Sequence, residues 1–543
     1  MPHTRNSASS GPHSETDTHA ITNQPAPRGD LDLWADDPAL QDHALDTDHD
    51  HLALFGRKMG RMGMRDAGMD ANRHQPEARL FDSGGRRLDE VAYHPAYHTL
   101  MQAGLGAGYA SLPWEGAEGG HATHAAMVYL ASQVEPGVCC PMAMTYAAVP
   151  ALRASSTLFD TWVPKLTARL YDPAVKPLAQ KAAATMGMAL TEKHCGSDLS
   201  QASTRAVRDG DAYRLRGHKW FCSAPMSDGL VTLAQTNGGL TAFLVPRWLD
   251  GTRNAVHIQR LKDTLGNKSN ALAEIEFADA LAYPLGDEGD GLRHIMTMIH
   301  HTRLDTAIAP AGLMRAALGA AHHWTQHRST AEGRLIDQPL MQSVLADLAL
   351  DWEGALALGL GVARAFDDTT EQGRAFARLG VALAKFLGSK LCPVVVGEAM
   401  ECLGGTGYIE ESGLPMLYRE APMNGIWQGS GNVICLDILR TLRAVPMAGE
   451  VLSDALGAVT GEFRRYDAAL RAHMERFPRL PDEAQARWYA DSLATLLTAS
   501  VLIRQAPPAI AEAYIATRLT SERGRTPGAI SGVDTGAILA RLG

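Results

Sequence analysis

The stretch Leu190-Thr-Glu-Lys-His-Cys-Gly-Ser-Asp198, together with Lys219-Trp-Phe-Cys-Ser223, decides the fold of this chain. The first segment ends in a turn of small residues, which offers backbone N–H groups and hydroxyls. The second segment places a tryptophan beside a serine hydroxyl. A flat, phosphate-bearing cofactor needs donors for its ring and phosphates and a plane to stack on. The two segments therefore predict a cradle for such a cofactor.

The cradle lies in a stretch, residues 187–290, whose pattern predicts a small β domain. Short apolar runs are separated there by Gly, Asn and Asp turns, as in a β-barrel or sandwich. The links Asp209-Gly210-Asp211 and Asn237-Gly238-Gly239 are typical of hairpins. We expect strands at Ala212–Leu215, Leu230–Ala234, Leu240–Val245, Ala255–Leu261 and Ala271–Phe277.

The sequence on both sides of the β domain is helical in pattern. Residues 31–186 predict an N-terminal helical domain and residues 291–445 a four-helix bundle, because long Ala/Leu-rich helices with short connections pack in that way. Residues 446–543 predict an appended helical domain whose end, Ser521–Gly543, looks loosely structured. Residues 1–30 are polar and are expected to be a disordered extension. The clearest helices are Ala125–Gln133, Met142–Leu152, Thr302–Ala321, Gln338–Ala365, Gly380–Leu403, Ala455–Arg476, Glu483–Arg504 and Ala509–Arg518.

The fold class is therefore mainly α with a central β domain, and the composition excludes several other classes. A chain of 543 residues with 45% hydrophobic content can bury several cores. We expect no membrane span, because no run of about 18 uncharged apolar residues occurs. The seven cysteines include no Cys-x-x-Cys pair, so we expect free thiols, a cytoplasmic location and no metal site.

The order of helical, β, helical and further helical segments resembles that of acyl-CoA dehydrogenases with an appended C-terminal domain. The resemblance spans residues 31–540 and is strongest to the AidB-like flavoproteins of the alkylation response. It implies FAD as the cofactor, acyl-CoA as a ligand and a homotetramer. Besides the cradle it rests on Gly85-Arg-Arg-Leu-Asp-Glu-Val91, His94-Pro95, Cys140-Pro-Met-Ala-Met-Thr-Tyr146, Arg260-Leu-Lys-Asp-Thr-Leu-Gly-Asn-Lys-Ser-Asn270 and Tyr418-Arg-Glu-Ala-Pro422.

The resemblance also assigns the residues that bind FAD. Thr191 and Ser223 would offer hydroxyls to the flavin ring, and Trp220 a stacking plane. The segments Leu403-Gly-Gly-Thr-Gly-Tyr408 and Trp427–Asn432 match the parts that the family uses for the ring edge and for the diphosphate of a neighbouring subunit. The full set is Leu190, Thr191, Gly196, Ser197, Trp220, Phe221, Cys222, Ser223, Arg328, Trp427, Gly429, Ser430, Gly431 and Asn432.

The chain departs from the family pattern just after Arg328. Ala331 and Glu332 stand where the family has a Phe-Gly pair. A glutamate near a pyrophosphate would repel it. We therefore expect either weaker FAD binding or a loop that points elsewhere.

The catalytic position of the family holds Gln428 in place of a glutamate. Oxidation of an acyl thioester at Cα–Cβ needs a base for the α-proton, and a carboxamide cannot accept it. The family's alternative position is Thr302, which also lacks a carboxylate. We therefore expect acyl-CoA dehydrogenase activity to be weak or absent.

Two other interpretations remain open. One is a working flavin-dependent oxidoreductase whose base is unidentified. The acids nearby in sequence are Asp305, Glu411 and Glu420, each of a kind that more commonly forms structural ion pairs. The other is a flavin-stabilised scaffold with no chemistry.

The C-terminal tail is weakly basic, although the whole chain has a net charge of −10. Residues 440–543 hold 13 Arg, no Lys and 11 Asp and Glu, a net charge of +2. The resemblance implies binding of double-stranded DNA through this domain, and arginine suits phosphate because its planar group binds in a bidentate way. The interspersed acids favour an ordinary solvated surface instead. The candidates for phosphate contacts are Arg440, Arg518, Arg523 and Arg525.

Overall fold

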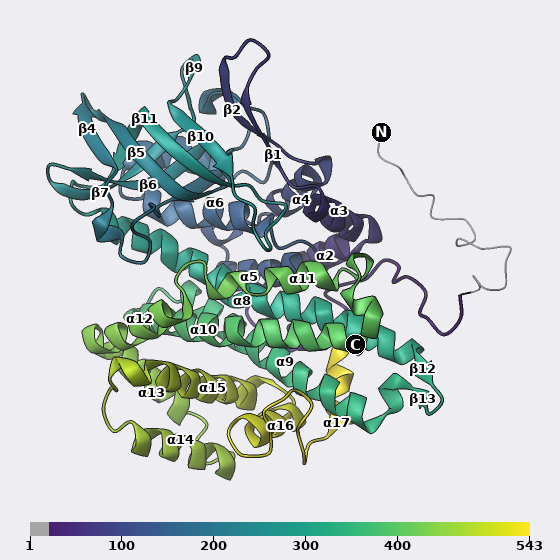
Figure 1. Cartoon of the computed structure of the whole chain (residues 1–543). Coiled ribbons are helices and arrows are strands. Elements are labelled where there is room, and N and C mark those ends of the chain that lie inside the picture. Colours follow the sequence, from purple (N-terminus) through teal and green to yellow (C-terminus); the bar gives the residue numbers. More distant parts are fainter. Residues whose placement is uncertain (1–20) are drawn as a thin grey trace.

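The computed structural model describes residues 21–543, in which one β domain lies at one end of the molecule, against layers of helices (Figure 1). The N-terminal part contains the two expected helices, here α5 and α6. Both are buried along almost their whole length, because alanine and other apolar residues line every face. Its elements are α1 (Pro38–His43), α2 (His49–Gly60), α3 (Met62–Arg73), β1 (Glu77–Phe81), β2 (Arg87–Ala92), α4 (Pro95–Gly106), α5 (Gly120–Ser132), α6 (Cys139–Leu152) and α7 (Ser156–Leu166).

The β domain forms a barrel. Its strand order is β10-β11-β7-β6-β3-β5-β4, and β11 pairs with β5 as well as with β7, which closes the sheet. All five expected strands are confirmed, and one of them, β5, runs on through Trp220 to Ser223. The strands are β3 (Met186–Ala189), β4 (Arg205–Asp209), β5 (Ala212–Ser223), β6 (Gly229–Thr236), β7 (Gly239–Pro246), β8 (Trp248–Leu249), β9 (Thr252–Arg253), β10 (Val256–Leu261) and β11 (Leu272–Leu285).

The C-terminal bundle contains the three long helices that were expected. They are α8 (Gly291–His327), α9 (Pro339–Asp367) and α10 (Glu371–Cys402), followed by α11 (Leu414–Glu420) and α12 (Gly431–Ala444). Helix α10 begins where the Thr370 side chain accepts a hydrogen bond from the Gly373 N–H. Among the described helices it alone is long and apolar enough to cross a membrane, but 78% of that apolar window is buried. It packs against α8 and α9 as a core helix.

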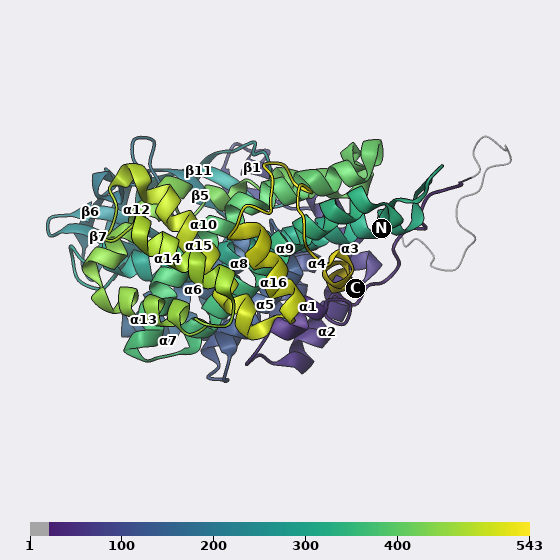
Figure 2. The same cartoon turned by 90° about the horizontal axis from the view of Figure 1, so that it is seen from below.

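The appended helices lie across the bundle, as the view from below shows (Figure 2). They are α13 (Pro446–Gly457), α14 (Arg464–Arg476), α15 (Ala486–Gln505), α16 (Pro508–Arg518) and α17 (Thr535–Leu539). The single helix expected at Ala455–Arg476 is wrong, since Gly461 adopts a φ of +97° and separates α13 from α14. The helices share one hydrophobic core with the bundle.

Both ends of the described chain are tied to the bundle. The expected loose tail is wrong, because Arg541 is 7% exposed and donates to Glu353 at 2.8 Å. The expected disorder is also wrong for residues 21–30. The Arg65 side chain donates to the Arg28 carbonyl at 2.8 Å, and the Asn23 side chain bonds the backbone of Ser329. The rest of that expected extension, residues 1–20, lies outside the described part.

Candidate functional site

The two segments of the predicted cradle lie side by side. The Trp220 N–H donates to the Thr191 carbonyl at 2.7 Å, which fastens β5 to the segment that follows β3. Glu192 and Cys195 exchange backbone hydrogen bonds of 2.8 and 3.2 Å, so a tight turn forms. Gly196 and Ser197 after the turn are exposed, which leaves their N–H groups open to a phosphate.

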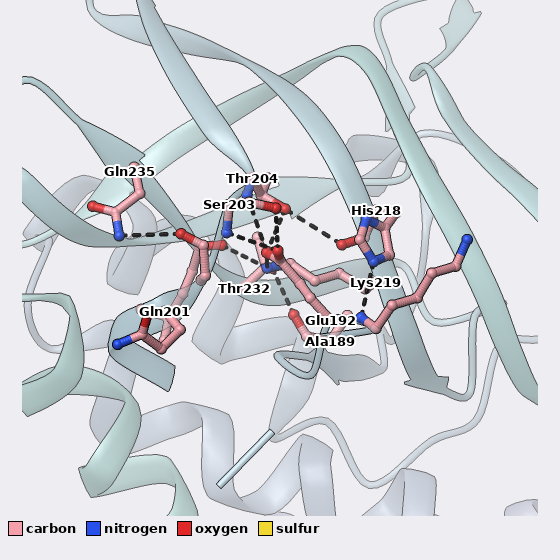
Figure 3. A network of polar contacts seen from close by, with 12 residues as sticks. Ala189, Glu192, Gln201, Ser203, Thr204, His218, Lys219, Thr232 and Gln235 are labelled. Carbon is pink, nitrogen blue, oxygen red and sulfur yellow. Dashed lines mark hydrogen bonds and ion pairs between the residues drawn. The ribbon is translucent and has the colours of Figure 1, made fainter. Parts of the chain in front are cut away.

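A buried ion pair holds the cradle in place (Figure 3). Lys219 Nζ lies 2.7 Å from Glu192 Oε1, and both side chains have no exposed surface. Ser203 and Thr204 donate further hydrogen bonds to the same carboxylate. Burial alone would raise the pKa of Glu192, but Lys219 and these donors outweigh burial and lower the pKa to about 2. This pair was not singled out from the sequence.

His194 and Cys195 lie close enough to Glu192 that the three side chains could together hold a metal ion. Both oxygens of the Glu192 carboxylate already accept hydrogen bonds from Lys219, Ser203 and Thr204. We therefore assign Glu192 to anchoring the cradle.

An apolar pocket of about 50 Å³ lies beside the cradle. The Phe221 ring of the cradle lies 6.4 Å from the Trp427 ring, which lines the pocket, and Cys140, another lining residue, lies near Ser223. The pocket therefore lies between the cradle and the C-terminal segment Trp427–Asn432. Its lining is Val128, Pro136, Cys139, Cys140, Ala143, Met144, Thr302, Asp305, Thr306, Ala309, Met423, Asn424, Trp427 and Gln428.

Gln428 and Thr302, the two positions at which a base was expected to be missing, both line this pocket. Gln428 has a φ of +58°, a conformation that a non-glycine residue adopts only when its surroundings hold it. Arg303 Nε donates to the Gln428 carbonyl at 3.1 Å. The turn is thus fixed with Gln428 at the pocket.

Lys385 supports the same turn and was missed in the sequence. Its ammonium donates to the carbonyls of Asn424 at 2.8 Å and Gly429 at 2.9 Å. Burial, reinforced by the positive charges of Arg303 and Lys390, lowers the pKa of Lys385 to about 7. The sequence signal that could have revealed Lys385 is a lysine within the otherwise apolar run of helix α10.

Asp305 is the one carboxylate among the described residues that line the pocket. It is 5% exposed. The Tyr109 hydroxyl donates to one carboxylate oxygen at 2.8 Å, and His124 Nε2 contacts the other at 2.9 Å. Because both oxygens accept hydrogen bonds within the fold, Asp305 is a weak candidate for a proton acceptor.

The other two acids lie outside the pocket. Glu411 is exposed, on the far side of the bundle near Arg328. Glu420 is 1% exposed and accepts a hydrogen bond from the Asn267 N–H. Burial, aided by the nearby Glu135, raises the pKa of Glu420 to about 8. Its carboxyl is therefore structural and protonated at neutral pH.

The variant Glu420→Gln is expected to lose less stability than the wild type between about pH 5 and about pH 8. The pKa of this carboxyl is 4.5 in the unfolded chain and about 8 in the fold, so the folded state keeps the proton and wild-type stability falls as the pH rises. Urea denaturation at the two pH values measures the difference. Equal losses in wild type and variant would contradict it, and Glu411→Gln at the exposed position serves as the control.

Several other residues assigned to the cofactor have clear positions. Leu190 is buried beside Thr191, and Ser430 is exposed at the start of α12. The Asn432 side chain accepts a hydrogen bond from Arg487 at 2.7 Å. The Cys222 side chain has no exposed surface and lies in the core of the barrel, so only the backbone of this residue is left to contact a cofactor.

Arg328 lies at a separate, open hollow of about 840 Å³, which Gly404, Gly405 and Thr406 also line. Its guanidinium donates to the Asn23 carbonyl at 2.9 Å. Glu332 is exposed between β12 (Ser329–Thr330) and β13 (Gly333–Arg334) and is not among the residues that line the hollow. Thr330 and Leu335 of this loop do line the hollow, so the loop borders it and only its tip, with Glu332, lies away from it. Weaker FAD binding stays a prediction.

Two of the four arginines proposed for DNA are engaged inside the protein. Arg518 lies 2.7 Å from Asp347 and 2.8 Å from Asp351, with 5% of its side chain exposed. Arg523 pairs with the same two carboxylates at 3.0 Å. Their assignment to phosphate contacts is therefore wrong. Arg440, whose side chain is 74% exposed, and Arg525 remain on the surface.

A helical domain, a β-barrel with a candidate cofactor cradle and a helical bundle that meet at one pocket define the fold of an acyl-CoA dehydrogenase. Three family models match the chain in this order. They are the adaptive response protein AidB N-terminal domain at residues 23–173, the acyl-CoA dehydrogenase middle domain at 187–280 and the acyl-CoA dehydrogenase C-terminal domain at 289–443.

The sequence is 42% identical to AidB of Escherichia coli (strain K12) over 517 residues, which cover 93% of this chain and 95% of AidB. The chain therefore belongs to the acyl-CoA dehydrogenase superfamily and to its AidB-like group. Caenorhabditis elegans ACDH-11 in complex with C11-CoA has a similar structure, with a TM-score of 0.83, 27% identity and coverage of 94% of this chain and 95% of that one. A glutaryl-coenzyme A dehydrogenase with glutaryl-CoA gives a TM-score of 0.57, 25% identity and coverage of 65% and 89%.

Proposed function

We propose that this protein binds FAD along the cradle and holds the acyl part of an acyl-CoA in the pocket beside it, with little or no dehydrogenation. Gln428 carries the proposal, because it occupies the pocket where a carboxylate base is needed. Its amide can hold a thioester by hydrogen bonding, but it cannot take the α-proton. The solved ACDH-11, with its C11-CoA ligand, supports an acyl-CoA as the ligand class.

The residues of the cradle fit a flavin. Ser223 is 7% exposed and lies next to Cys140 at the pocket, Thr191 adjoins Trp220, and the exposed Gly196–Ser197 turn offers N–H groups. A bound flavin would supply a hydride acceptor. The chain's own residues orient the acyl group and exclude water from the pocket, and the Asp305 carboxylate is held by hydrogen-bond contacts with Tyr109 and His124.

Replacement of the cradle hydroxyls is expected to weaken FAD binding. Thr191→Val and Ser223→Ala should each raise the FAD dissociation constant about 5-fold, since each removes one hydrogen bond worth about 1 kcal/mol. Quenching of protein fluorescence on titration of the apoprotein measures the change. Ser200→Ala is the control, because that hydroxyl donates to Asp198. Unchanged affinity in both cradle variants would place the flavin elsewhere.

We also propose a homotetramer in the cytoplasm, in which the Arg328 hollow completes the site of a neighbouring subunit. Thr302 at the pocket and Arg328 lie on the same helix, 26 residues and therefore about 39 Å apart. One dinucleotide cannot span that distance. This separation supports a contact between Arg328 and the cofactor of another subunit.

A second proposed function is binding of double-stranded DNA as part of an alkylation response. The supporting observation is a group of exposed arginines on the appended helices and beside them, namely Arg440, Arg464, Arg465, Arg471, Arg476, Arg479, Arg487 and Arg525. Exposed guanidinium groups contact phosphates without reading sequence.

DNA affinity is expected to fall steeply with salt, in proportion to the number of phosphates contacted. Arg440→Met should weaken binding to all DNA sequences equally. It should also reduce the slope of log affinity against log salt concentration by about one. Fluorescence anisotropy with a labelled duplex at several salt concentrations measures both. Affinity that does not change with salt, or no binding at low salt, would contradict this function.

A further inference from the structure

A partly open chamber of about 320 Å³ lies away from the pocket that contains Gln428, where the β1–β2 hairpin and α4 meet the barrel. Figure 1 shows this hairpin beside the barrel strands. The chamber shares no lining residue with the pocket that contains Gln428. Its size is within the range of sites for small organic molecules.

Arg247 is the unusual group in this chamber. It is 8% exposed and follows β7. Its Nη1 donates to the Met226 carbonyl at 3.1 Å, while Nη2 is buried and has no hydrogen-bond partner within residues 21–543. No carboxylate among those residues lies within 4.0 Å of it, so it forms no salt bridge there. Burial lowers the pKa of Arg247 to about 10, which still leaves it charged.

The other buried charges of the chamber are matched within the fold, and Arg79 lies at its exposed rim. Lys181 lies 2.7 Å from Asp228, which also accepts a hydrogen bond from the Thr185 N–H at 2.8 Å. Glu90 pairs with Arg253 at 2.9 Å. A buried charge is costly unless it is paired, so the guanidinium of Arg247 calls for an anion.

The residues that line the chamber indicate the chemistry of the uncharged part of the ligand. Tyr93 and Tyr97 stack with their centroids 4.1 Å apart, and Met101, Pro141 and Val91 add apolar surface. The Tyr93 hydroxyl is buried and makes no hydrogen bond of ordinary geometry within the described chain. Asp172 and Asp228 also line the chamber and would repel a dianion. A monoanion with a flat or apolar body fits these walls best.

We propose that the chamber binds a small organic carboxylate, whose charged group pairs with Arg247 and whose apolar body lies against Tyr93 and Tyr97. Arginine holds a carboxylate through two parallel hydrogen bonds, which suits the free Nη2. Ala224 lines the chamber directly after Ser223 of the cradle. The chamber is thus a second ligand site behind the flavin-binding strand.

The test uses the FAD-loaded protein with benzoate as the probe and benzamide as its neutral counterpart. Benzoate at millimolar concentrations is expected to raise Tm progressively, as a ligand of the folded state does, whereas benzamide and inorganic phosphate are not. Arg247→Met should weaken benzoate binding at least 10-fold, and Arg79→Met at the exposed rim should not. Without ligand, Arg247→Met should be no less stable than the wild type, since an unpaired buried charge is removed.

The proposal is overturned if benzoate leaves Tm unchanged, if benzamide acts equally, or if Arg247→Met responds as the wild type does. Should Arg247→Met fail to fold, Tyr93→Phe provides the second variant, because loss of that hydroxyl should weaken benzoate binding several-fold while leaving the fold intact. A crystal structure of the protein co-crystallised with benzoate would also overturn the proposal if it showed only water at Arg247.

Discussion

The variant Gln428→Glu is expected to reduce its bound flavin with an acyl-CoA about 10²–10⁴ times faster than the wild type. Position 428 lines the pocket that adjoins Ser223, and its backbone is held by Arg303 and by contacts of Lys385 with the neighbouring Gly429. A glutamate there would differ from glutamine by one atom and would supply the missing proton acceptor. Stopped-flow absorbance under anaerobic conditions measures the rate of flavin bleaching.

Two controls separate this gain from a change in pocket shape. Gln428→Met has a similar volume and no titratable group, so it should remain as slow as the wild type. The rate of Gln428→Glu should rise with pH as the new carboxyl loses its proton. If Gln428→Glu binds FAD and an acyl-CoA normally but gains no rate, position 428 is not the base position of this pocket.

The variant Arg518→Met is expected to lose about 3–5 kcal/mol of unfolding free energy, because it leaves buried carboxylates without one of their partners. Arg518 contacts both Asp347 and Asp351, and Asp347 has no exposed surface. Urea denaturation measures the loss. Arg440→Met, at an exposed side chain, should change stability by no more than about 0.5 kcal/mol.

For DNA affinity, the expected effects of the two variants are reversed, with the larger effect for Arg440→Met. Under conditions in which both are folded, Arg440→Met should weaken binding and Arg518→Met should not. An Arg518→Met protein that is as stable as the wild type, or that loses DNA affinity while folded, would contradict the assignment of Arg518 to the interior.

The elements of the fold were largely predictable from sequence because their signals are local. Short apolar runs bounded by turn residues predict the barrel strands. The helical spacing of apolar residues predicts α8, α9 and α10. Local signals failed at Gly461, which divides one expected helix into α13 and α14. They also failed at the tail, whose order depends on contacts of Arg541 with the distant Glu353.

Family motifs mark Thr191, Trp220 and Gln428 in the sequence, and the structure brings their segments together, while their roles toward a cofactor stay predictions. The supports of the candidate site were not predictable, because Lys385 and the Glu192–Lys219 pair act through contacts that join separate elements. Arginine alone does not reveal its role either. Arg518 and Arg440 differ only in what lies next to them in the fold, and this cannot be read from composition.

The central claim is that this flavoprotein holds an acyl-CoA without oxidising it efficiently. The most direct measurement is the visible spectrum of the purified, FAD-loaded protein before and after anaerobic addition of acyl-CoAs of several chain lengths. Our account predicts a shift of the flavin bands on binding, with the oxidised absorbance retained for minutes. Bleaching of the flavin within seconds by any of these acyl-CoAs would contradict it, and would show that the pocket contains a working base other than Gln428.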